Sequence, residues 1–91
     1  MKLIYNNKNL ELRFGVREML LFQEVTKGRV FQGESLTDCF YMFWIMVQVA
    51  YGKAIQWEEF SHYVDDNPQI FSDYMEWLVT IFQTEENTQK N

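Results

Sequence analysis

The sequence predicts a mainly α-helical single domain with minor β content, in which a short N-terminal β-hairpin precedes four helices packed compactly around a buried central helix. One observation behind this α+β fold class is the stretch at residues 39–51, CFYMFWIMVQVAY, where Gln48 is the only residue that is neither apolar nor aromatic. A helix that is apolar on nearly all sides has to be covered by neighbouring segments. The other observation is the alternation of apolar and charged residues in LELRF, at residues 10–14, which is typical of a strand with one face in water.

The composition limits the class of protein. The chain has 91 residues, of which 47% are hydrophobic and 18% aromatic, which is enough for one domain with its own core and excludes disorder for most of the chain. The apolar stretch is shorter than the roughly 20 residues that cross a bilayer, so no membrane span is expected. Cys39 is the single cysteine and no secretory signal pattern is present, so we expect a protein of the reducing cytoplasm.

The N-terminal hairpin is expected over residues 2–14. Two short apolar runs flank the connector NNKN at residues 6–9, and asparagine tolerates the left-handed backbone conformation that tight turns need. Leu10, Leu12 and Phe14 alternate with charged residues, and this pattern predicts the strand face that packs against the helices.

A first helix is expected over residues 16–26, before the Lys27-Gly28 stop. Its apolar residues are expected to face inward and its charged residues outward. The expected inner residues are Val16, Met19, Leu20, Leu21 and Val25, and the expected outer residues are Arg17, Glu18 and Glu24.

The central helix is expected over residues 35–51. Ser35 stands three residues before Asp38, a spacing that resembles a capping box and predicts Ser35 as the N-cap. Gly52 is the expected C-cap, because glycine readily adopts the left-handed conformation found at helix ends.

Two further helices are expected at residues 57–65 and 68–83, separated by the break DDNP at residues 65–68. Proline is favoured at the first position of a helix and asparagine at its N-cap, so the break also starts the last helix. Residues 84–91 are polar and are expected to form a flexible tail. The globular domain is therefore expected to occupy residues 1–83.

Charge is distributed unevenly along the chain. Residues 1–33 hold six basic and three acidic residues, a net charge of +3, whereas residues 34–91 hold two basic and ten acidic residues, a net charge of −8. Nucleic-acid binding needs a basic stripe, and the small N-terminal excess is interleaved with glutamates. We therefore expect no nucleic-acid and no membrane partner, and a basic protein surface as the natural partner of the acidic half.

The residues that could carry chemistry form no complete constellation. Cys39 and His62 could pair as thiol and imidazole, but a cysteine inside an apolar helix is inert because burial disfavours the thiolate. One histidine and one cysteine do not complete a structural zinc site. The oxygen-bearing residues from Asp65 to Glu76 match the spacing of a calcium loop, but Ile70 stands where that loop needs glycine. We therefore expect a protein that is not an enzyme and has no metal or cofactor.

The apolar surface of the central and last helices exceeds what a short helix and a hairpin can cover. Such a surplus indicates a groove for an apolar helix of a partner protein, or the interface of a homo-oligomer. Methionine gives such a groove adaptable walls, and aromatic side chains supply contact area. The residues expected to contribute are Met42, Met46, Met75, Trp77 and Phe82.

The order of segments and several short motifs resemble the small tail assembly chaperones of long-tailed bacteriophages and prophages. The motifs are Phe14-Gly15-Val16-Arg17, Thr26-Lys27-Gly28, Tyr51-Gly52, Trp57-Glu58-Glu59-Phe60 and Asp65-Asp66, and the resemblance covers roughly residues 8–82. It implies a protein of the bacterial host cytoplasm that binds the long, helical, aggregation-prone tape measure protein during tail assembly. It also implies that this protein keeps the tape measure protein soluble and is absent from the finished particle.

Two other functions stay open at this point. One is an acidic inhibitor that mimics nucleic acid, which needs carboxylates spaced along one exposed ridge. The other is a structural, oligomeric subunit for tail or head completion, which is distinguished from a chaperone by its presence in purified particles.

Overall fold

The elements follow one another in the order β-β-α-α-α-α, in a computed structural model that describes the backbone of residues 1–90 and the side chains of residues 1–82. Their bounds are β1 (Lys2–Tyr5), β2 (Lys8–Glu11), α1 (Val16–Val25), α2 (Leu36–Tyr51), α3 (Trp57–Asp66) and α4 (Pro68–Lys90). The predicted fold class, a mainly helical domain with a short N-terminal hairpin, is confirmed.

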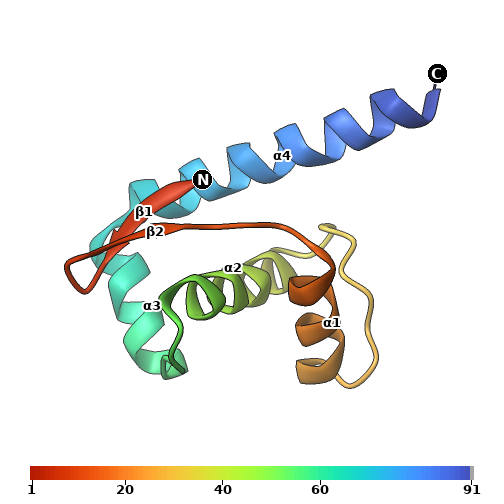
Figure 1. Cartoon of the computed structure of the whole chain (residues 1–91). Helices are drawn as coiled ribbons and strands as arrows, with labels where there is room; N and C mark the ends of the chain where they lie inside the picture. The colour runs from red at the N-terminus through yellow and green to blue at the C-terminus, as the bar shows by residue number, and fades with distance from the viewer. Residues whose placement is uncertain (91) are drawn as a thin grey trace.

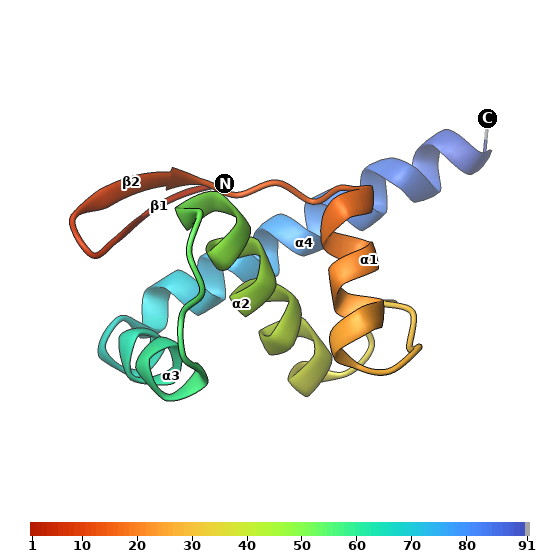
Figure 2. The same ribbon diagram turned by 60° about the horizontal axis from the view of Figure 1, so that its bottom comes forward.

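Helix α2 is the centre of the domain. It lies between α1 and α3, and α4 runs along a further side of it (Figures 1 and 2). The Ser35 hydroxyl accepts a hydrogen bond from the Asp38 N–H at 3.3 Å, and Gly52 ends the helix with a φ of 81°. Both predicted caps are therefore confirmed. The buried residues of α2 are Cys39, Met42, Phe43, Ile45, Met46 and Val47.

The hairpin reverses direction at Asn6 and Asn7, whose φ angles of 51° and 63° lie in the left-handed region. The strands are antiparallel, and Leu3 pairs with Leu10. Both leucines are buried and belong to the face that packs on the helices. The hairpin is shorter than the sequence predicts, since β2 already ends at Glu11.

Helix α1 turns a different face inward from the one that its apolar residues predict. Glu18 is only 5% exposed, whereas Val16, Leu20 and Val25 are 68%, 59% and 50% exposed. The Glu18 Oε1 accepts a hydrogen bond from the Gly15 N–H at 3.0 Å, and this bond satisfies a free donor at the start of the helix. The predicted inner positions of the three apolar residues and the predicted outer position of Glu18 are therefore wrong.

Helix α4 closes the core over α2. The Tyr74 ring stacks on the Phe43 ring with centroids 4.2 Å apart, and the Tyr74 hydroxyl donates to the Cys39 carbonyl at 2.8 Å. Burial raises the pKa of the Tyr74 hydroxyl, so this group remains a donor. The contact joins the first half of α2 to the first third of α4.

The last helix is longer than the sequence predicts. It continues through Lys90, where a flexible tail is predicted over residues 84–91, because no glycine or proline follows Pro68 to interrupt it. Its C-terminal part extends beyond the other elements (Figure 1). Asn91 and the side chains of residues 83–90 lie outside the described part of the chain.

The loop between α2 and α3 is fixed by Gln48. Its Oε1 accepts the Ile55 N–H at 2.9 Å, and its Nε2 donates to the Trp44 carbonyl at 3.3 Å. The Trp44 indole N–H donates to the Ile55 carbonyl at 2.8 Å. Both backbone polar groups of the buried Ile55 are thus satisfied by α2 side chains.

We expect Gln48→Ala to lower the free energy of unfolding by about 1–3 kcal/mol, because the Ile55 N–H loses its acceptor. Equilibrium urea unfolding followed by circular dichroism measures this change. Gln56→Ala is the matched control, since Gln56 is exposed and makes no side-chain cap hydrogen bond. We expect its effect to stay within about 0.5 kcal/mol, and equal effects of the two substitutions would contradict the role given to Gln48.

Candidate functional site

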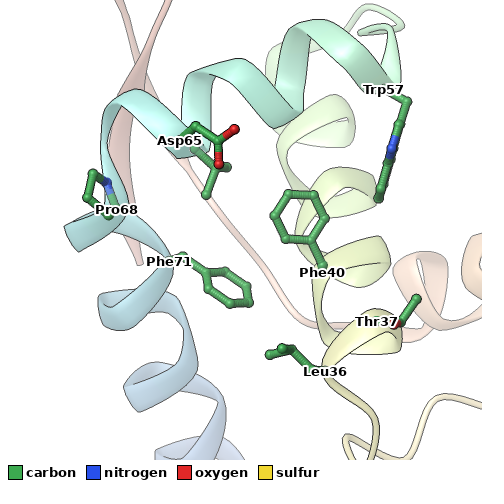
Figure 3. A pocket seen from close by; sticks show the side chains of 8 residues that line it. Leu36, Thr37, Phe40, Trp57, Asp65, Pro68 and Phe71 are labelled. Atoms are coloured by element: carbon green, nitrogen blue, oxygen red, sulfur yellow. The ribbon is translucent and has the colours of Figure 1, made fainter.

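An open apolar hollow lies between the start of α2, helix α3 and the start of α4 (Figure 3). Its volume is about 460 Å³, within the range of about 300–1,000 Å³ that is typical of ligand-binding clefts. We term it the α2–α4 groove. The residues that line it are Leu36, Thr37, Phe40, Trp57, Val64, Asp65, Pro68 and Phe71.

The floor of the groove is aromatic. The Phe40 ring centroid lies 5.2 Å from Trp57, 5.4 Å from Phe60 and 5.4 Å from Phe71. Figure 3 shows the Phe40 and Phe71 side chains pointing toward one another from α2 and α4. Aromatic pairs at such distances contribute about 0.5–1.5 kcal/mol beyond the burial of their area, so the rings hold one another in place.

Trp57 forms one wall of the groove and is 38% exposed. Its ring centroid lies 5.0 Å from that of Trp44 and 4.9 Å from that of Tyr41, both on α2. Trp57 follows directly after the loop that Gln48 holds. The position of this wall is therefore set by α2, and the wall is formed before any partner arrives.

Leu36 forms the rim on the opposite side. It is the first residue of α2 and is 67% exposed. Single exposed leucines are common on protein surfaces, but this one borders a concave apolar surface. Concave apolar surfaces that remain open to water mark binding sites for proteins or ligands.

The edge of the groove is negative. Asp65 is the only charged residue among the described side chains that line it, and Glu58, Glu59 and Asp66 are exposed on the same helix. None of these four carboxylates forms an ion pair within the described part of the chain. The groove therefore combines an apolar floor with one carboxylate at its edge, that of Asp65, whereas Glu59 and Asp66 border a separate hollow.

Two of the residues predicted to bind a partner are core residues. Met42 and Met46 are 0% and 1% exposed, because β2 and α1 both pack on α2. The prediction that they line a groove on the surface is therefore wrong in this structure.

The other three predicted residues, Met75, Trp77 and Phe82, are partly exposed on α4 and do not line the α2–α4 groove. The Phe82 ring centroid lies 5.8 Å from Phe14 and 6.1 Å from Phe31, so this side chain helps to pack α4 on the body of the domain. Partner binding by these three residues stays a prediction.

Apolar side chains are also exposed on α1 and on the loop that follows it. They are Val16, Leu20, Val25 and Val30. None of them lines the α2–α4 groove.

The candidate catalytic residues lie in different surroundings. The Cys39 thiol is buried in the core and donates to the Gly33 carbonyl over 3.7 Å, and burial raises its pKa, with a smaller contribution from the Asp38 charge. His62 is exposed on α3.

The residues whose spacing resembles that of a calcium loop lie on helices. Residues 65–76 belong mainly to α3 and α4 and do not form a single calcium-binding loop. Among the side chains that the structure describes, no three His, Cys, Asp or Glu residues gather as ligands. Within the same part of the chain, no helix has the length and apolar character that crossing a membrane requires.

Comparison of the chain with protein-family models, with curated proteins and with solved structures finds no match. The groove and the sequence motifs are therefore the observations on which a function is argued.

We expect Cys39 to react with Ellman's reagent only when the protein unfolds, because a buried thiol with a raised pKa offers neither access nor thiolate. At mildly alkaline pH the native rate is expected to be at least about a hundredfold below the rate in concentrated urea. The introduced thiol of Ser72→Cys, at an exposed position of α4, serves as the control for a reactive site. Equal native rates for the two thiols would contradict the burial of Cys39.

Proposed function

We propose that the chain is a non-enzymatic protein-binding module that holds an amphipathic helix of a partner in the α2–α4 groove. We further propose that it acts as a tail assembly chaperone of a bacteriophage or prophage, in the cytoplasm of the bacterial host. Its partner is then the helical tape measure protein, which it keeps soluble. The observation that carries the proposal is an apolar, preformed groove whose walls remain exposed at Leu36 and Trp57.

A helix suits the groove because the groove is lined by side chains of three helices, most of them apolar. An amphipathic helix presents side chains at i, i+3, i+4 and i+7 along one face, and such a stripe fits an apolar groove. An extended strand would need an open sheet edge instead.

The motifs that resemble the chaperone family fall at element boundaries. Gly15 precedes α1, Gly28 and Gly52 have φ angles of 106° and 81°, and Asp65-Asp66 ends α3. These residues support a shared arrangement of elements. The groove supports the binding of a helical protein, and the two observations together favour the chaperone.

The two alternative functions find less support in the surface. A mimic of nucleic acid needs a ridge of carboxylates, whereas the carboxylates of α3 stand beside exposed aromatic and aliphatic side chains. A structural tail or head-completion subunit, or a homo-oligomer, could use the same apolar surfaces, and its presence in purified particles distinguishes it from a chaperone.

Co-expression with a tape measure protein from the same genome tests the proposal. We expect the chain to increase the soluble fraction of that protein, and Leu36→Glu to reduce this increase severalfold, because a charge on the rim opposes burial of the apolar stripe. Leu36→Glu is expected to fold normally, since a glutamate in the first turn of a helix is favourable.

Val16→Glu is the matched control for Leu36→Glu. Val16 is the first residue of α1 and is 68% exposed, and Leu36 is the first residue of α2 and is 67% exposed. The two substitutions therefore add the same charge at the same helical position, but only Leu36 borders the groove. An unchanged soluble fraction with the wild-type chain, or equal effects of the two variants, would refute the proposed use of the groove.

A further inference from the structure

We infer that the partner helix presents a lysine or arginine beside its apolar anchor residues, and that this cation pairs with Asp65 at the edge of the α2–α4 groove. The inference rests on the proposed function, because it concerns the occupant of the same groove. It narrows the occupant from any amphipathic helix to one whose apolar stripe is bordered by basic side chains.

Asp65 is placed for such a contact. It is exposed in the last turn of α3 and lines the groove between Val64 and Pro68. Figure 3 shows its carboxylate at the border of the groove, on the side of α3 and the start of α4. Asp65 forms no ion pair with any residue in the described part of the chain. A partner that covers this carboxylate removes water from it, and a lysine or arginine on the partner offsets this loss more strongly than a neutral hydrogen-bond donor does.

The lining of the groove carries charge of one sign only. Among the side chains that the structure describes, Asp65 is the charged residue of the lining, and no lysine or arginine lines the groove. Clefts lined by one sign of charge attract partners of the opposite sign and repel partners of the same sign.

Asp66 provides a control that few charged sites offer. It is adjacent to Asp65 at the end of α3, is also exposed, and stands next to the same helix start. It does not line the α2–α4 groove, and it borders instead a separate hollow with Tyr5 and His62. Charge reversal at either position therefore has the same effect on net charge and on the two helix ends, but only one of them changes the groove.

Two synthetic helical peptides test the inference. Both carry the same leucine and phenylalanine stripe, and the residues that border the stripe are lysines in one peptide and glutamates in the other. Fluorescence anisotropy measures the binding of each labelled peptide to the wild-type protein, to Asp65→Lys and to Asp66→Lys. The measurement is repeated at low and high salt.

We expect the wild-type protein to bind the lysine peptide about five- to tenfold more tightly than the glutamate peptide at low salt. This preference is expected to shrink at high salt, because salt screens exposed charges. Asp65→Lys is expected to abolish or invert the preference, whereas Asp66→Lys is expected to retain most of it.

Several outcomes would overturn the inference. Equal binding of the two peptides, or the same loss of preference in both variants, would refute the pairing of a partner cation with Asp65. The proposed binding of a helix in the groove would still stand. Binding of neither peptide to the folded protein contradicts the proposed function itself. Self-association of the wild-type chain that Leu36→Glu abolishes would identify a second copy as the occupant, and this also overturns the inference.

Discussion

The structure depends on the need to cover α2, a helix that is apolar on nearly every side. The rest of a short chain supplies that cover: α1 and α3 pack on two sides, α4 on a third, and β2 also contacts the helix. Burial of apolar surface drives this arrangement. Cover is complete over the middle of α2, where Met42, Phe43 and Met46 are almost fully buried. It ends near the first turn, where the α2–α4 groove leaves Leu36 exposed.

Polar groups decide how this apolar core becomes a site with a fixed shape. Gln48 is the only polar residue in the most apolar stretch, and it satisfies the backbone of the loop that leads into Trp57. The wall of the groove is thus positioned by a hydrogen bond near the other end of the same helix. Glu18 has a similar role in α1, where one buried carboxylate fixes the helix start and turns apolar side chains toward water. In each helix one polar side chain thus fixes a neighbouring segment: Gln48 holds the loop that leads into Trp57, and Glu18 holds the start of α1.

The sequence predicted the elements well and the site poorly, for physical reasons. Helix starts follow from local chemistry, such as the Ser35 cap and the Asp-Asp-Asn-Pro break, which act over a few residues. The fold class also follows from the apolar stretch, which any structure has to bury. Exposure depends on neighbours that are distant in sequence. The sequence pattern alone therefore could not show that Met42 and Met46 are buried while Leu36 is exposed. An apolar residue stands at the first position of α2 and of α3, at Leu36 and Trp57, but Val16 has the same position in α1 and lies outside the groove, so this feature does not single out the site.

The contact between Tyr74 and α2 has a consequence for synthesis of the protein. Cys39 and Phe43 belong to α2, and the ring and hydroxyl that cover them belong to α4, which follows α2 and α3 along the chain. Domains begin to form from the N-terminus while the ribosome is still at work. The nascent chain therefore exposes one side of its most apolar helix until α4 has also been synthesised. The proposed function is to prevent aggregation of another chain, yet this protein itself exposes an aggregation-prone apolar surface before α4 packs on α2.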